Sequence, residues 1–201
     1  MNHLAHLRLA PPDPRVRAGA LLGDFARGLD VQALPAPTQQ GLLHHRAIDR
    51  FTDAHPAFAQ SRARVQAPLR RFAGVLVDVF YDHFLADGWP EFGDGRPLGA
   101  FTAEVYAQLQ TEAASLPPAL AAALPRMIRN DWLAQCRTDV GVAAVLARIA
   151  ARLRRPVPLA DAVADLQQQR PAFAADFALF WRDVAAFAAS MEHGPEDQRA
   201  S

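Results

Sequence analysis

Prolines divide this chain into stretches that are rich in helix-forming residues, and this pattern constrains the fold more than any other feature. Ala, Leu, Arg and Gln dominate these stretches, and all four have a high helix propensity. No segment alternates apolar and polar residues as a half-buried strand does. We therefore predict an all-α, single-domain helical bundle. The expected helices cover residues 2–9, 14–28, 37–53, 56–67, 69–87, 98–115, 117–136, 139–154 and 159–191.

A single domain is expected over residues 1–193, because a chain of 201 residues suits one domain with a substantial core. Residues 194–201 have the polar composition of a flexible tail. In the TDAHP segment, Asp53 is the expected cap of the helix whose first turn contains Pro56. The Gly/Pro-rich segment 87–99 is either a loop at the mouth of a site or a connector between helices.

Composition excludes several classes of function. The chain contains no lysine, which P-loop and Schiff-base chemistry both require. Its net charge is zero and it has no recognition motif, so nucleic acid is not an expected partner. Cys136 is the only cysteine, so a disulfide framework and a thiolate metal site are excluded. Because no apolar run could cross a bilayer and the first residues lack a signal-peptide pattern, we expect a cytoplasmic protein without a membrane partner.

Two pairs of ionisable residues have helical spacing: His45 with Asp49, and Asp78 with Asp82. The members of each pair are four residues apart, so their side chains project from one helix face. Both pairs lie in apolar stretches, where such groups are costly unless they are paired or bind a metal. Two such helices packed face to face would bring four ligands together. The pattern favours a metal-dependent hydrolase over a solvated surface pair or a buried ion network in a non-catalytic binding module.

Asp24 and His6 are further candidates. Asp24 follows Gly23, which would allow close approach, although an ion pair with Arg27 is an alternative explanation. His6 is a candidate for contact with a metal or a phosphate, whereas its neighbour His3 is expected to be only partly exposed.

The choice between two adjacent histidines rests on geometry. His45 is preferred to His44 because it pairs with Asp49, and neighbours on a helix point about 100° apart. His55 precedes Pro56 and is expected to cap a helix or to contact the site.

The ligand set mixes oxygen and nitrogen without sulfur, which suits a divalent Mn²⁺, Mg²⁺ or Fe²⁺ ion. Such an ion lowers the pKa of bound water and offsets the charge of a phosphate, as phosphoester hydrolysis requires. Arg46 and Arg27 lie near the candidate ligands in sequence and could clamp a phosphate. Taken alone, each of these arginines is better explained as a solvated side chain.

Four segments in the first part of the chain form the most specific pattern. They are MNHLAHLRLA at 1–10, GALLGDFARG at 19–28, HHRAIDRFTDAHP at 44–56 and VDVFYDHFLADGW at 77–89. In this order they resemble the acyl carrier protein phosphodiesterases, also called acyl carrier protein hydrolases. Beyond them, only the spacing of helices and the NDWL turn at 130–133 are similar.

The resemblance implies an all-α fold distantly related to the HD-type metal phosphohydrolases. It implies removal of the 4′-phosphopantetheine arm from holo-acyl carrier protein, which gives the apo protein, usually with Mn²⁺. His83 or His6 would donate a proton to the leaving serine alkoxide, and Arg46 would contact the phosphate. The metal would be held by all or some of Asp24, His45, Asp49, Asp78 and Asp82.

The chain departs from the family pattern in two places. It has no His-Asp dipeptide, only the reversed pair Asp82-His83, so the HD ligand pattern cannot be transferred directly. Arg8 stands where a histidine is expected in some relatives, which leaves His6 as the better candidate.

Carrier proteins are small and acidic, so the resemblance also implies a basic docking surface. The expected substrate-binding residues are Arg27, His55, Arg62, Arg70 and Arg71. Arg64 belongs to the same cluster, and Arg152, Arg154 and Arg155 form a second, less favoured one. A phosphohydrolase acting on a nucleotide or another small phosphoester is the alternative with the same site. The sequence does not define the oligomeric state.

The second half of the chain is expected to be a scaffold. Its last predicted helix carries aromatic residues at the spacing of an amphipathic helix, which favours core packing over a cofactor pocket. These residues are Phe173, Phe177, Phe180, Trp181 and Phe187.

Overall fold

The computed structural model describes residues 2–25 and 28–192, and this part of the chain is helical and contains no β-strand. The predicted all-α fold is therefore confirmed. The α-helices are α1 (His3–Leu9), α2 (Pro14–Leu22), α3 (Ala36–Ala54), α4 (Pro56–Arg64), α5 (Ala73–Asp87), α6 (Trp89–Phe92), α7 (Leu98–Thr111), α8 (Pro118–Arg129), α9 (Asp139–Ala150), α10 (Val163–Gln168) and α11 (Arg170–Glu192). The 3₁₀ helices are η1 (Gly23–Phe25), η2 (Val31–Ala33), η3 (Leu69–Phe72), η4 (Ala113–Ser115), η5 (Gln135–Arg137) and η6 (Leu159–Ala162).

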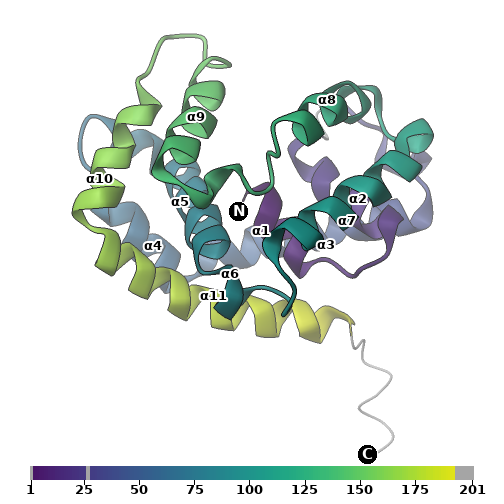
Figure 1. Cartoon of the computed structure of the whole chain (residues 1–201), viewed down its shortest axis with the longest axis horizontal. Helices are drawn as coiled ribbons and strands as arrows, with labels where there is room; N and C mark the ends of the chain where they lie inside the picture. Colours follow the sequence, from purple (N-terminus) through teal and green to yellow (C-terminus); the bar gives the residue numbers. More distant parts are fainter. Residues whose placement is uncertain (1, 26–27, 193–201) are drawn as a thin grey trace, which may run out of the picture.

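Helices α1 and α5 pack against each other near the centre of the molecule, between two groups of helices (Figure 1). One group contains α4, α9 and α10, and the other contains α2, α3, α7 and α8. The long helix α11 runs along one side and contacts α1, α3, α4 and α5. The arrangement therefore brings the first turns of the chain next to segments that follow much later in the sequence.

The core is built around α5 and α11. Helix α5 is buried along most of its length, because most of its side chains are apolar. The aromatic stripe on α11 packs into the core as predicted. Phe173, Phe177, Phe180 and Trp181 are buried, and Phe187 packs against them while partly exposed.

Helices α2 and α3 approach each other very closely. A Cβ atom at Gly41 of α3 would overlap the backbone carbonyl of Val16 in α2, so only glycine allows this contact. The close packing fixes α3, which carries His45 and Asp49, against the end of α2.

Several predicted helices are shorter or divided in the structure. The stretch 159–191 forms η6, α10 and α11, with a break at Gln169. Pro171 explains the break, because proline cannot continue a helix that begins before it. The predicted helix 14–28 ends as an α-helix at Leu22, where η1 takes over.

The cap of α4 also differs from the prediction. Asp53 lies inside α3, and His55 is the N-cap instead, because its Nδ1 accepts the backbone N–H of Ala57 at 3.2 Å. Pro56 begins α4 as predicted.

The segment 87–99 contains the short helix α6 and connects α5 with α7. Arg8 donates to the carbonyl oxygen of Gly93 at 2.9 Å, and the indole of Trp89 donates to that of Arg96 at 2.7 Å. No residue of this segment lines the cavity described below, so it is a connector.

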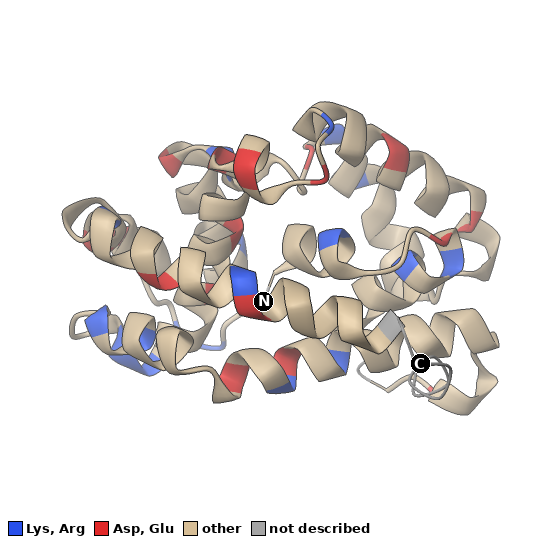
Figure 2. Ribbon diagram, turned by 90° about the horizontal axis from the view of Figure 1, so that it is seen from below, with Lys and Arg blue, Asp and Glu red and all other residues tan. Residues whose placement is uncertain are grey.

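Helices α3, α9 and α11 carry both acidic and basic residues, whereas each of the other α-helices carries charges of one sign only (Figure 2). Within the described ranges, no helix has both the length and the apolarity needed to cross a membrane. The expected tail 194–201 and Arg27 lie outside the described residues.

Candidate active site

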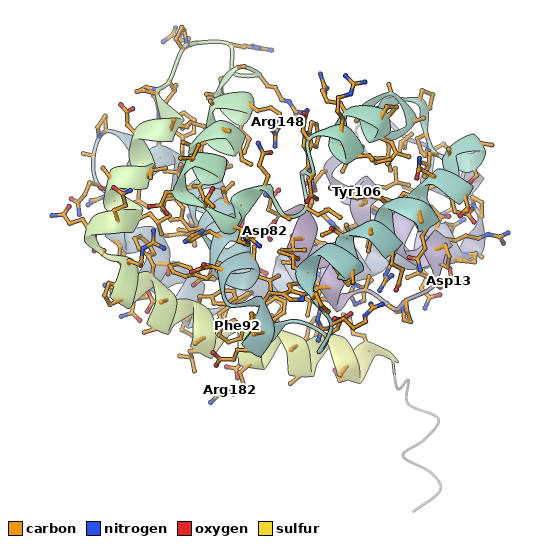
Figure 3. The ribbon with its side chains drawn as sticks, in the orientation of Figure 1. Asp13, Asp82, Phe92, Tyr106, Arg148 and Arg182 are labelled. Atoms are coloured by element: carbon orange, nitrogen blue, oxygen red, sulfur yellow. The ribbon has the colours of Figure 1, made fainter. Side chains whose placement is uncertain are left out.

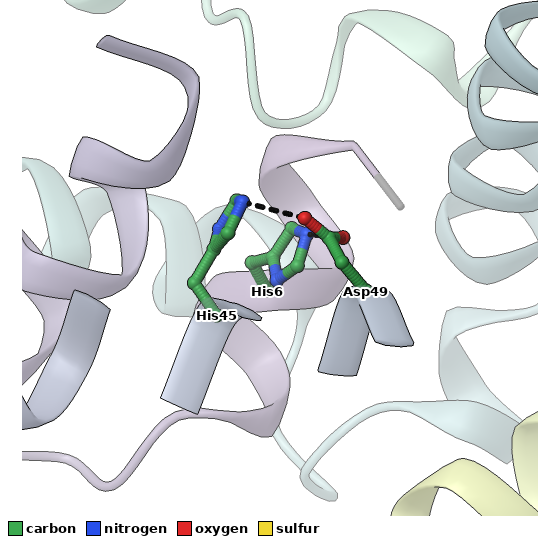
Figure 4. Close-up of side chains that lie close together, drawn as sticks. All are labelled: His6, His45 and Asp49. Carbon is green, nitrogen blue, oxygen red and sulfur yellow. Dashed lines mark ion pairs between the residues drawn. The ribbon is translucent and has the colours of Figure 1, made fainter. Parts of the chain in front are cut away.

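Three of the predicted site residues come together from α1 and α3 (Figure 4). His6 belongs to α1, and His45 and Asp49 belong to α3. Nε2 of His45 lies 3.0 Å from Oδ2 of Asp49, and Nε2 of His6 lies 3.2 Å from Oδ1. The two imidazole rings stack with their centroids 3.7 Å apart. One ligand atom from each residue lies within 4.8 Å of the others, so this triad can hold a metal ion.

The orientation of His45 is the strongest indication of a cation. Its Nδ1 lies 2.7 Å from the carbonyl oxygen of Ala20, which can only accept, so Nδ1 carries a proton. In the neutral ring, Nε2 then presents a lone pair to a carboxylate oxygen of Asp49. Two acceptors facing each other need a cation between them, either a proton or a metal ion.

Gly23 makes room for this arrangement. A Cβ atom at this position would overlap the ring of His45, so a side chain here would displace the imidazole. The close approach expected at Gly23 is therefore the contact between η1 and His45.

The electrostatics of the triad favour metal-binding protonation states. Burial lowers the pKa of His6 to about 4, so this ring is neutral near pH 7. Burial alone would raise the pKa of Asp49, but the imidazoles of His45 and His6 hold it well below its usual range. A neutral histidine and an ionised carboxylate are the forms that bind metals.

A cavity of about 230 Å³ lies close to the triad. Its polar lining includes Asn2, His3, Asp24 and Asp78. Nδ1 of His3 lies 2.7 Å from Oδ2 of Asp24. Burial alone would lower the pKa of His3, but the carboxylate of Asp24 raises it overall. His3, expected only to be partly exposed, is thus held in the cavity wall by a carboxylate.

Asp24, Asp49 and Asp78 share one electrostatic environment. Burial raises the pKa of Asp78, and the carboxylates of Asp49 and Asp24 raise it further. Burial would raise the pKa of Asp24 as well, but the imidazoles of His3, His6 and His45 hold it well below its usual range. Three carboxylates therefore lie close enough to act on one another or on the same imidazoles, and two of them, Asp24 and Asp78, line the cavity.

Asp82, the partner of Asp78 in the sequence pattern, has a different environment. Its carboxylate is buried and accepts the backbone N–H groups of Leu4 and Ala5 at 3.1 and 3.2 Å. These N–H groups belong to the first turn of α1, where they have no partner within the helix. Burial raises the pKa of Asp82 to about 7, although the two backbone hydrogen bonds oppose the shift. The structure thus brings Asp82 to the start of α1 rather than into the triad.

His83 points to the other side of α5. Its Nδ1 donates to the carbonyl oxygen of Cys136 at 2.8 Å, and its Nε2 accepts from Arg170 at 2.6 Å. Arg170 also binds Asp139 at 2.5 Å. The structure does not bring His83 to the cavity.

The predicted substrate-binding residues lie outside the cavity wall. Arg46 is exposed on α3, directly after His45. Arg62, Arg70 and Arg71 are exposed around the turn between α4 and α5.

His55 is tied to α11 rather than to the site. Its Nε2 lies 3.3 Å from Oδ2 of Asp183, and its ring packs against Phe51 and Phe180.

One wall of the cavity comes from the second half of the chain, which was expected to be a scaffold. Trp132, Arg148, Ile149 and Arg152 line the cavity together with the residues from α1 and α5. The guanidinium carbon of Arg148 lies 4.2 Å from the ring centroid of Trp132, and the ring of His3 stacks on the same indole at 6.4 Å. The NDWL turn was the one sequence signal for this wall.

The NDWL turn is a Schellman motif that ends α8. The N–H of Trp132 bonds the carbonyl oxygen of Met127, and the N–H of Asp131 bonds that of Ile128. Asp131 has a φ of 41°, a left-handed conformation that Asp tolerates better than most residues. Tyr106 donates to its carboxylate at 3.1 Å. These contacts fix the direction in which the chain presents Trp132 to the cavity.

Comparison with known proteins identifies the family. The family described as "Acyl carrier protein phosphodiesterase" matches residues 1–184. The chain belongs to this family. A curated relative from Salmonella dublin with this name is 33% identical over 189 residues, which cover 94% of this chain and 98% of that protein. A second, from Enterobacter sp., is 32% identical over 181 residues, which cover 90% of this chain and 94% of that protein.

Membership confirms two predictions, the family resemblance seen in the first segments of the chain and the assignment to an enzyme class, the phosphodiesterases. No solved structure matches the chain significantly. The relationship to the HD-type fold therefore stays a prediction.

Proposed function

We propose that the chain is a metal-dependent phosphodiesterase that removes the 4′-phosphopantetheine arm from holo-acyl carrier protein and releases apo-acyl carrier protein. The observation that carries this proposal is the triad of His6, His45 and Asp49 beside a cavity with two further carboxylates, in a chain of this family. Hydrolysis of a phosphodiester needs a group that offsets the phosphate charge and activates water. The triad is suited to hold such a group.

The donor set fits a divalent cation held by His6, His45 and Asp49. The set mixes imidazole nitrogen with carboxylate oxygen and contains no sulfur, so we propose Mn²⁺, with Mg²⁺ or Fe²⁺ as alternatives. When bound, the ion would polarise the phosphate and lower the pKa of a water molecule. The negative charge of Asp24 would help to retain it, and the cation would in turn favour the ionised form of Asp78.

Within this proposal His3 donates the proton to the leaving group. The leaving serine alkoxide is strongly basic, so its departure needs a proton donor. His3 lines the cavity, and Asp24 orients its ring through Nδ1, which leaves Nε2 to exchange a proton. The two histidines that the sequence favoured are less suited, because His6 belongs to the triad and His83 is bonded to Arg170.

The turn between α4 and α5 supports docking of an acidic protein. Arg62, Arg70 and Arg71 are exposed there, and α5 continues into the cavity wall with Val75 and Asp78. An acidic carrier protein bound to these arginines would have its prosthetic group close to the cavity. Rates that fall steeply with salt would support this surface, whereas a small phosphoester substrate predicts little salt dependence.

Intact mass spectrometry tests the reaction directly. Purified holo-acyl carrier protein is incubated with the full-length enzyme and Mn²⁺, beside the same mixture with EDTA. The expected result is a loss of mass equal to the phosphopantetheine arm, only in the sample with Mn²⁺.

An unchanged mass, from enzyme that is folded and metal-loaded, would reject the carrier-protein substrate and direct attention to small phosphoesters. No bound metal and no shift in melting temperature on adding Mn²⁺ would instead favour a non-catalytic binding module.

A further inference from the structure

We propose that Arg148 and Arg152 form an anion subsite in the cavity wall, which binds the phosphate of the substrate phosphodiester. The identity of the anion rests on the proposed function, while the subsite itself rests on the geometry of this wall. Arg148 is half-buried in α9, and Arg152 follows just after the end of this helix. Both line the cavity that also contains Asp24 and Asp78.

The guanidinium groups in this wall have no acidic partner among the described residues. Arg148 donates one hydrogen bond, to the side-chain oxygen of Gln135 at 3.0 Å, and that group is neutral. Neither Arg152 nor the nearby Arg126 forms an ion pair within the described part of the chain. By contrast, the buried Arg17 binds Glu104 at 2.7 Å.

Several cations close together without carboxylates are unfavourable unless an anion joins them. Arg152 and Arg126 both act on Arg148, and burial together with their positive charge lowers its pKa. A bound phosphate would offset this repulsion, and a guanidinium group matches its oxygen atoms bidentately.

Trp132 positions Arg148 for this role. The guanidinium carbons of Arg148 and Arg126 lie 4.2 and 5.5 Å from its ring centroid, within the range of cation–π contacts. The indole is buried, and its Nε1–H has no acceptor among the described residues. A stacked, half-buried Arg148 loses little side-chain freedom when it binds a ligand.

The cavity is divided chemically in a way that suits a phosphodiester with an organic arm. His3, Asp24 and Asp78 lie on α1, η1 and α5, next to the triad, whereas the arginines come from α9 and its end. The remaining lining is mainly apolar, from Val75, Val79, Val145 and Ile149. An anion held by the arginines would face the triad's side of the cavity, with the methyl and methylene groups of its organic arm along these aliphatic side chains.

Phosphate binding can be measured without turnover. The full-length protein, labelled with ¹⁵N, is titrated with inorganic phosphate while the indole N–H resonances of its three tryptophans are followed. The resonance of Trp132, assigned with Trp132→Phe, is expected to shift. That of Trp89, whose N–H is bonded to Arg96, is expected to stay in place.

Arg148→Gln is expected to weaken phosphate binding at least about tenfold, because charge-assisted hydrogen bonds are lost. Arg182→Gln is the matched control, since it removes the same charge on the opposite side of the molecule (Figure 3). It should leave the affinity unchanged. No shift of the Trp132 resonance, or equal affinities for Arg148→Gln and the unmodified protein, would overturn the subsite.

The two proposals can fail separately. If holo-acyl carrier protein is cleaved but Arg148→Gln binds phosphate normally, the subsite is wrong and the reaction stands. If the carrier protein is not cleaved but phosphate binding depends on Arg148, the subsite stands and only the identity of its natural anion changes.

Discussion

The two sides of the cavity carry different kinds of ionisable groups. On the side of α1, α3 and η1, carboxylates are matched with imidazoles: His45 and His6 face Asp49, and His3 faces Asp24. On the side of α9, guanidinium groups cluster on an indole without an acidic partner among the described residues. In the proposed site, the first side would bind a cation and the second side an anion.

This difference indicates how a phosphodiester can be held in one orientation. A cation on one side and fixed guanidinium groups on the other would contact the same phosphate from two directions. The two sides come from different halves of the chain. Substitutions can therefore alter one side of the cavity without changing the other, and the two sets of variants can be compared.

The largest effect is expected on the carboxylate side, from His45→Ala and Asp49→Ala. Each change removes a proposed metal ligand, so turnover of holo-acyl carrier protein should fall about 10³-fold or more. Turnover is measured together with bound metal by elemental analysis. His44→Ala is the matched control, because His44 is buried on the same helix but outside the triad. Near-normal turnover and metal content in either variant would remove that residue from the site.

A pH-dependent effect on stability is expected from Asp82, which ties α1 to α5. Burial raises its pKa to about 7, so the folded protein holds this proton more strongly than the unfolded chain does. Its contribution to stability is complete below about pH 4 and is lost as the pH rises through about 7.

Denaturant unfolding of Asp82→Asn across this range isolates the effect. The unmodified protein should lose stability relative to the variant by up to about 1.4 kcal/mol per pH unit. Parallel pH profiles for the two proteins would contradict the shifted pKa.

Gly23→Ala should disturb the triad although Gly23 is not itself one of the proposed metal ligands. The added methyl group would displace the ring of His45, and loss of ligand orientation typically costs about 10–100-fold in activity or metal affinity. Gly74→Ala in α5 is the control, because nothing lies within 4 Å of a Cβ atom there. Equal metal affinity in both variants would show that the contact at Gly23 does not position His45.

The smallest effect is expected on the arginine side, from the turn that presents Trp132. Asp131→Ala would lose both tolerance of a φ of 41° and the hydrogen bond from Tyr106, at a cost of about 1–2 kcal/mol of stability. Asp131→Asn keeps both features and should be nearly neutral. Denaturant unfolding of the two variants decides the question, and equal destabilisation would mean that the charge matters instead.

Local spacing predicted those parts of the site that depend on one helix. Residues four apart on a helix face the same way, so the sequence alone indicated that His45 and Asp49 would meet, and they do at 3.0 Å. With the same spacing, Asp78 lies in the cavity wall and Asp82 at the start of α1, because the neighbours of a helix decide where each side chain goes. Asp82 meets the free N–H groups of α1, which no pattern within 77–89 reveals.

The fold was predictable for a similar reason. The cavity wall that contains Arg148 and Arg152 was not predictable. Propensity and proline spacing are local signals, and they gave the all-α class. The break before α11 was missed although Pro171 marks it. No pattern in the sequence singled out Arg148, because its proposed role depends on what surrounds it: Trp132 lies beside it, and it has no acidic partner among the described residues.

The hydrogen bonds from Leu4 and Ala5 to Asp82 close loops of 78 and 77 residues. Such long-range contacts form late in folding, because the chain must lose the entropy of a large loop before they stabilise it. During synthesis, the first turn of α1 can bind its acceptor Asp82 only after α5 has left the ribosome. The arginines of the cavity wall follow later, with α9. A growing chain therefore carries His45 and Asp49 well before the proposed site is complete, because the cavity wall extends to Arg152.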